Sequence, residues 1–160
     1  EIIPVSVLRD LDLSGASSFT GDLEGDKVDI DLSGASVYKG DVTAHDIDFD
    51  LSGASFCEGN VETDKLSFEL SGASSATVSG YCQNMMEMDL SGASHINAAH
   101  LNVSDIRGSM SGGSYADVTC CSSLNVSLSG GSTLVYGVIS EECTPIVNCP
   151  CSGGSIVRPR

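Results

Sequence analysis

Apolar and polar residues alternate strictly in a stretch that recurs along the whole chain. In its second copy, Val28, Ile30 and Leu32 alternate with Asp29 and Asp31. Later copies carry the apolar pairs Ile47 and Phe49, Leu66 and Phe68, Met86 and Met88, and Leu124 and Val126. A period of two residues is typical of a β-strand with one buried side, whereas a helix needs apolar residues three and four positions apart. The pattern therefore predicts strands and no helix.

Each alternating stretch ends in one turn motif, Leu-Ser-Gly-Ala-Ser, which becomes Ser-Gly-Gly-Ser after the lead residue in the last three copies. The lead residue of the motif occurs eight times, at Leu13, Leu32, Leu51, Leu70, Leu90, Met110, Leu128 and Cys151. The intervals, from 32 − 13 to 151 − 128, are 19, 19, 19, 20, 20, 18 and 23 residues. A fixed period of about twenty residues indicates a fold of stacked repeats.

The residues around the motif predict the shape of one coil. The glycine suits a turn, and the small Ala or Gly after it is expected to face inward at the bend. The serine hydroxyls are expected to form hydrogen bonds along the coil axis. The position six residues after each lead residue is mostly apolar and is expected inside; it holds Phe19, Tyr38, Cys57, Ala76, Ile96, Ala116, Leu134 and Val157. Each coil is thus expected to contain two or three short strands.

Stacking such coils gives an all-β fold, a right-handed single-stranded parallel β-helix with coils of about 19 residues. The repeats predict one β-helix domain over residues 1–160. A leucine-rich repeat is the alternative, but it requires Asn three residues after the last apolar strand position, where this chain has Ala or Gly.

The eight spaced motifs resemble those of the bacterial head GIN domain family, over essentially the whole span from Asp10 to Ser155. Proteins of that family are secreted or surface proteins, common in Bacteroidetes, and are described as auto-transporter adhesins with a right-handed β-helix. The resemblance implies a location outside the cell or in the cell envelope. It implies no catalytic or ligand-binding residue.

Composition narrows the choice of partners. The net charge is −15, with only seven Lys and Arg residues. Binding to nucleic acid requires Lys and Arg to replace counterions, so this charge argues against nucleic acid, and equally against an anionic membrane surface. The chain also lacks the run of ~20 apolar residues that a transmembrane helix needs.

The polar positions of the alternating stretches predict two columns of acidic side chains on the outside of the stack. One column contains Asp10, Asp29, Asp48 and Glu87, and the other contains Asp12, Asp31, Asp50, Glu69 and Asp89. Stacked carboxylates repel one another, and Ca²⁺ with its oxygen ligands would relieve the repulsion. Loosely bound Ca²⁺ is therefore one expectation, with Asp29, Asp31, Asp48 and Asp50 as the candidate ligands; a solvated acidic face without a cofactor is the simpler one.

No residues form a catalytic pattern. The serines lie in no nucleophile elbow, and His45, His95 and His100 occupy different columns. Arg107 follows Glu87 in the outer column, which predicts a surface ion pair. The remaining cations, Lys27, Lys39 and Lys65, are not expected to share a column with acids facing them across a cleft.

The seven cysteines leave at least one thiol free if the others pair within the chain. Cys57, Cys149 and Cys151 fall at inward positions and are expected in the core. Cys120 or Cys121 is expected to form a disulfide with Cys143 in the next coil.

These observations favour a non-catalytic surface or secreted module, adhesin-like, that presents a flat side to an extracellular glycan or protein. This interpretation depends largely on the family resemblance. The alternatives are a pectinase-like enzyme acting on polysaccharides and a purely structural envelope scaffold. The pattern predicts no particular oligomeric state.

Overall fold

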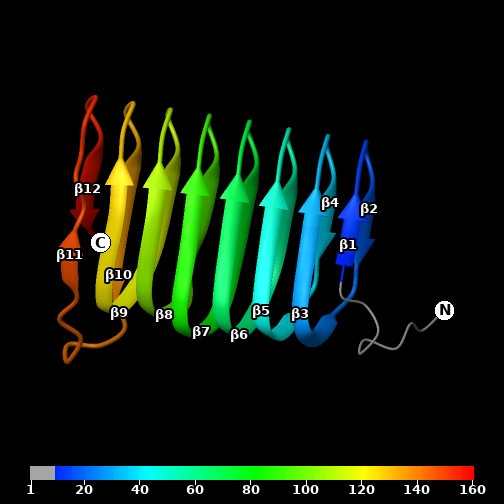
Figure 1. Ribbon diagram of the computed structural model, residues 1–160, viewed down its shortest axis with the longest axis horizontal. Coiled ribbons are helices and arrows are strands. Elements are labelled where there is room, and N and C mark those ends of the chain that lie inside the picture. Colours follow the sequence, from blue (N-terminus) through cyan, green and yellow to red (C-terminus); the bar gives the residue numbers. More distant parts are fainter. Residues whose placement is uncertain (1–9) are drawn as a thin grey trace.

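The computed structural model describes residues 10–160, which form one parallel sheet wound into a rod, without a helix (Figure 1). The strands are β1 (Asp10–Leu13), β2 (Ser18–Thr20), β3 (Leu23–Leu32), β4 (Val37–Lys39), β5 (Val42–Leu51), β6 (Phe56–Leu70), β7 (Ser75–Leu90), β8 (His95–Met110), β9 (Tyr115–Leu128), β10 (Thr133–Val138), β11 (Ile146–Asn148) and β12 (Ile156–Pro159). Among these residues no helix could span a membrane.

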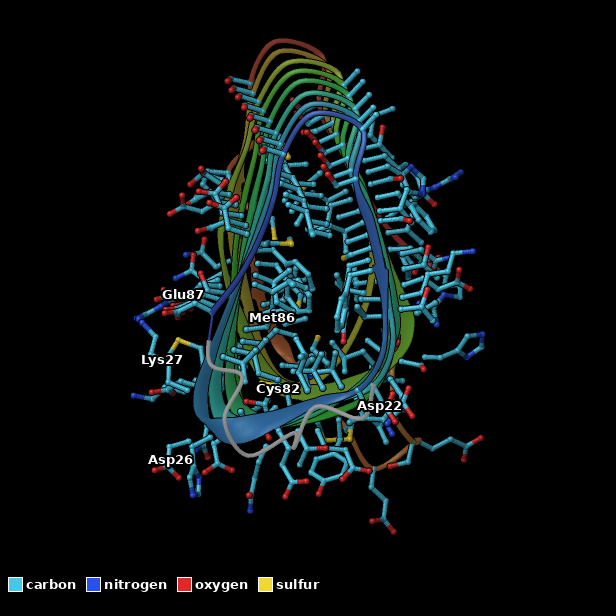
Figure 2. All side chains as sticks on the ribbon, turned by 90° about the vertical axis from the view of Figure 1, so that its right-hand side faces the viewer. Asp22, Asp26, Lys27, Cys82, Met86 and Glu87 are labelled. Atoms are coloured by element: carbon cyan, nitrogen blue, oxygen red, sulfur yellow. A yellow bond between two sulfur atoms is a disulfide. The ribbon has the colours of Figure 1, made fainter. Side chains whose placement is uncertain are left out.

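Every coil pairs in parallel with the coil before it, in the order β1-β3-β5-β6-β7-β8-β9-β10-β12. Viewed from the N-terminal end, the chain runs clockwise from Asp22 through Asp26 to Lys27 while later coils recede, so the winding is right-handed (Figure 2). The predicted right-handed parallel β-helix with coils of about 19 residues is confirmed.

Each coil has three sides. We call the strand segment that ends at the lead residue the lead face (residues 27–32 in β3), the segment after the motif the return face (β4), and the segment joining them the base (residues 23–25). In Figure 2 the lead face lies on the left, below the pointed end of the section. The expectation of short strands holds for the first coils only, because β6 to β9 are single strands of 14–16 residues that continue around the corner of the base.

A narrow apolar core fills the rod. The lead residues from Leu32 to Leu128 are buried, as are six of the eight residues at the position six residues later; Phe19 and Val157 in the end coils are partly exposed. Phe49 and Phe68 stack inside with ring centroids 5.0 Å apart. Apolar residues align from coil to coil because the ladder keeps them in register.

The structure of the turn motif differs from the prediction in which small residue it buries. Its glycine has a positive φ, +71° at Gly53, and a Cβ there would collide with the carbonyl oxygen of Gly34 in the coil below. The residue after the glycine points outward, since Ala35 and Ala54 are exposed. The buried small residue is the second serine, found at Ser36, Ser55, Ser74, Ser94, Ser114 and Ser132.

The serine hydroxyls bond mainly within their own motif. Each second serine donates to the carbonyl oxygen three residues earlier, at 2.6–3.0 Å in the six buried copies. Axial contacts of the first serines are longer, 3.4–3.5 Å for Ser91, Ser111, Ser129 and Ser152. The predicted axial hydroxyl ladder is therefore secondary, and the second serine closes its own turn.

The last coil departs from the repeat. β11 pairs with β9, and a disulfide joins Cys121 to Cys143, which confirms one of the two predicted pairings. Cys57 is buried as expected. The core position predicted for Cys149 and Cys151 is wrong, because Cys149 is half-buried and Cys151 is exposed. The lead residue of the final motif has no following coil to cover it in the described chain.

Candidate ligand-binding surface

The ladder places both predicted acidic columns on the lead face. Asp29 lies between Asp10 and Asp48, and Asp31 lies between Asp12 and Asp50. Asp31 and Asp50 are exposed, as predicted. Asp29 and Asp48 are only partly exposed, which corrects the prediction for these two residues.

The cause is Lys27, whose ammonium lies across the first column. Its Nζ is 3.3 Å from Asp29 Oδ1 and 3.2 Å from Asp48 Oδ2. The hydrogen bonds to Asp48 and Asp29 raise the pKa of Lys27, while desolvation raises the pKa of Asp48 against the opposing effect of Lys27. Lys27 thus supplies the positive charge that the stacked carboxylates require.

The second column contains no Lys or Arg. Its register is Asp12, Asp31, Asp50, Glu69, Asp89 and then Ser109. Partial desolvation, and then the charges of Asp50 and Asp12, raise the pKa of Asp31. Within residues 10–160 no three His, Cys, Asp or Glu side chains are placed to hold one metal ion. Loose Ca²⁺ association along this column stays a prediction.

A column of alternating charge runs beside the first acidic column. Its register is Lys27, Asp46, Lys65, Met85, Asp105 and Ser123, so Lys27 and Lys65 share a column with an acid between them. The acid lies between the two lysines along the column and does not face them across a cleft. The predicted ion pair is confirmed, because Arg107 Nε donates to Glu87 Oε1 at 2.6 Å.

A groove opens between these two columns where the acidic column contains Ser67 in place of an acid. A hollow of about 360 Å³ forms there, lined by Lys27, Asp46, Asp48, Lys65, Leu66, Ser67, Met85, Glu87 and Arg107. Lys27 and Glu87 project outward from this face, whereas Met86 and Cys82 point into the rod (Figure 2). The short Ser67 side chain leaves the space that its longer neighbours enclose.

A second hollow of about 550 Å³ continues the first toward the C-terminus. The two share Met85 and Arg107, and the second is lined by Gln83, Asn84, Ser104, Asp105, Ile106, Ser122, Ser123 and Asn125 as well. We call both together the lead-face groove. Hydroxyl and amide groups dominate its C-terminal half.

Two β-bulges at the corner between base and lead face build this half. Between the pairs Cys82–Val103 and Met85–Asp105, β7 has two residues where β8 has one, and β9 has two residues opposite the same Ser104. A bulge expels a residue from the ladder and turns its side chain to a new direction. The bulged residues Asn84 and Ser122 line the groove as a result.

The C-terminal end of the groove borders β11. Asn148 of β11 donates to Asn125 Oδ1 at 3.4 Å, and Ile146 pairs with Ser123. The disulfide fastens the segment before β11 through Cys121, a residue of the second bulge. The disulfide was expected from the sequence, but its place beside a groove was not.

The structure does not bring the histidines, serines and free cysteines of residues 10–160 together in one site. The three histidines are all exposed: His45 Nδ1 lies 3.0 Å from Asp64 Oδ2, and His95 stacks on Tyr115. The buried serine hydroxyls are engaged with backbone carbonyls. Burial raises the pKa of the Cys82 and Cys120 thiols to about 11, which keeps them protonated at neutral pH.

The model of the family described as "Putative auto-transporter adhesin, head GIN domain" matches residues 2–137. No curated protein and no solved structure matches the chain.

Proposed function

Since the chain belongs to the head GIN domain family, we propose that it is a non-catalytic, adhesin-like module that binds a glycan or protein outside the cell or in the cell envelope. The observation that supports binding, beyond the family description, is the lead-face groove, a hollow shared by several coils of a rigid stack. Concave sites with a few convergent polar groups are the usual places for ligands.

The state of the acids favours binding over cleavage. A glycosidase needs one carboxylic acid with a raised pKa facing a second carboxylate across the sugar. In the groove, Glu87 is paired with Arg107, Asp48 with Lys27, and Asp105 accepts a hydrogen bond from Ser123 at 2.5 Å. Each of these acids is held by its own neighbour on the same face: desolvation raises the pKa of Asp48, but the Lys27 ammonium beside it opposes that rise. A purely structural scaffold, the other alternative, would have no use for the two bulges that hollow this face.

Binding of the purified chain to an array of extracellular glycans and proteins tests the proposal. We expect saturable binding to at least one ligand, with the ligand recovered at unchanged mass after long incubation. Failure to bind any arrayed ligand would overturn the adhesin-like function, and release of shortened glycan would favour the enzyme.

A further inference from the structure

We propose that the lead-face groove binds an uncharged glycan chain that lies parallel to the axis of the rod. The inference rests on the proposed binding function and specifies its ligand and its site. It depends on the length of the groove, the chemistry of its walls and the way in which the fold constructs it.

The groove is long and follows the rod. Its lining begins at Lys27 of β3 and reaches Asn125 of β9, and the strands between them are β5, β6, β7 and β8. Five steps between adjacent strands of ~4.8 Å give a length of ~24 Å. A groove of this length suits several consecutive units of an extended polymer and exceeds what a single small molecule fills.

The charges along the groove nearly cancel, because the second hollow adds only the acid Asp105, which accepts a hydrogen bond from Ser123. Its three cations, Lys27, Lys65 and Arg107, are matched by the three acids Asp46, Asp48 and Glu87 in the first hollow. A polyanion would gain little there and would be repelled by the net charge of −15. A polycation would prefer the second acidic column, where no Lys or Arg competes. The groove therefore favours a ligand without charge.

The groups that remain available are those that pair with sugar hydroxyls. Side-chain amides and hydroxyls both donate and accept hydrogen bonds, as sugar hydroxyls do. Gln83 and Asn84 are exposed at the first bulge, and Ser122 is exposed at the second. The half-buried Met85 provides an apolar contact for the C–H side of a sugar ring.

Two of the cations keep donors free for a ligand. Lys65 is the one lysine of the described chain without an ion pair, since Lys27 pairs with two aspartates and Lys39 with Glu58. Arg107 uses Nε and Nη2 on Glu87, which leaves Nη1 available. Glu87 thereby fixes the guanidinium at the junction of the two hollows, where it is common to both linings.

Inward polar side chains hold the corner in its irregular form. The buried hydroxyl of Thr63 donates to the carbonyl oxygens of His45 at 2.9 Å and Lys65 at 2.8 Å. In the next coil the Cys82 thiol lies 3.0 Å from the Met85 carbonyl oxygen. These contacts lie where the register between β6 and β7 shifts, between the pairs Thr63–Cys82 and Lys65–Met85, so the hollows are a defined part of the fold.

The test compares glycans and groove variants by calorimetry. The probes are neutral oligosaccharides (cello-, galacto- and N-acetylglucosamine oligomers, from disaccharide to hexasaccharide), with oligogalacturonate as the anionic probe and oligochitosan as the cationic probe. We expect a neutral oligomer to bind with an affinity that rises with chain length and oligogalacturonate to bind more weakly, whereas binding of oligochitosan at the second acidic column should not respond to changes in the groove.

Three changes probe the site. Ser67→Phe fills the first hollow, Lys65→Ala removes its free cation, and Asn84→Ala removes an exposed amide. Each should weaken binding of the neutral oligomer about tenfold, a loss typical of a contact at the centre of an interface. The matched control is Ser75→Phe, which adds the same ring to the return face and should change affinity less than twofold.

The outcomes separate this inference from the adhesin-like function. Glycan binding that all three groove variants leave intact would place the site elsewhere, and would overturn the inference alone. A preference for oligogalacturonate over every neutral oligomer, binding of oligochitosan that the groove variants weaken, or binding of protein ligands only would do the same. Binding of no ligand would overturn both proposals.

Discussion

The second serine of the turn motif should contribute to stability through one local hydrogen bond, and Ser74→Ala tests this. Ser74 is 0% exposed, and its hydroxyl donates to the carbonyl oxygen of Ser71 at 2.8 Å. The first serine of the same motif, Ser71, is exposed, and its own hydroxyl forms no hydrogen bond within residues 10–160. The two serines therefore provide a matched pair, one engaged and one free.

The expected magnitude follows from the surroundings of the bond. A neutral hydrogen bond contributes about 1 kcal/mol net, and a buried acceptor left without a donor costs up to about 3 kcal/mol. Ser71 is exposed, so water can reach its carbonyl oxygen and limit the cost. We expect Ser74→Ala to lower the free energy of unfolding by about 1–2 kcal/mol, which corresponds to a fall in Tm of about 2–8 °C for a domain of this size. Ser71→Ala should change it by less than about 0.5 kcal/mol.

A double-mutant cycle with Ser55→Ala decides between a local bond and an axial ladder. Ser55 bonds to Ser52 in its own turn at 2.8 Å, so the two losses should add within about 0.5 kcal/mol. A continuous ladder of hydroxyls would couple them. Thermal and denaturant unfolding, followed by circular dichroism, give the four free energies. Equal costs for Ser71→Ala and Ser74→Ala, or strong coupling between Ser55 and Ser74, would refute the local account.

The remaining predictions concern charge and thiols. The hydrogen bond to Asp64 raises the pKa of His45, so the pair should stabilise the protein below pH 6.5 and lose this contribution as pH rises through the raised pKa; NMR titration should show the pKa of His45 falling in Asp64→Asn. Millimolar Ca²⁺ should raise Tm more than NaCl of equal ionic strength. Asp31→Asn with Asp50→Asn should abolish the difference and raise the Tm of the ion-free protein, because partial desolvation and then the charges of its acidic neighbours raise the pKa of Asp31. Equal responses to both salts would leave the column a solvated face. Alkylation of the unfolded, unreduced protein should label five cysteines, and labelling of all seven would exclude the disulfide.

The repeat and its alternating residues were sufficient to predict most of the fold. In a stacked parallel fold, a residue one period away along the chain becomes a ladder neighbour, so coil lengths set the register directly. The lead residues and the inward column at Tyr38 and Cys57 follow from that rule, as does a disulfide to Cys143 from Cys120 or Cys121, whereas the choice of Cys121 required the structure. The rule fails at Cys151, because inward positions are covered only where another coil follows.

The turn motif could not be derived from residue size alone. Alanine and serine are both small, and the sequence does not show which of them points inward. The structure places serine inside because the tight turn leaves the carbonyl oxygen of the first serine without a backbone donor. The hydroxyl of the second serine lies at the correct distance to donate a hydrogen bond to it. At Ser55 the buried hydroxyl serves that carbonyl, whereas the methyl of Ala54 could not.

The number of residues in each coil predicts one of the two bulges that form the groove, but not the other. The coil that begins at Leu70 has 20 residues, so one residue must leave the ladder, and the structure places that bulge at Gln83 and Asn84. The coil that begins at Met110 has only 18 residues, yet β9 carries a bulge at the same corner. Elsewhere in that coil β9 has no residues opposite 99–101 of β8, which shortens the coil. The extra residue of the second bulge therefore cannot be recognised from the length of the coil. Two compensating changes in one coil leave its length uninformative, so only the three-dimensional register reveals that the bulges align into one groove.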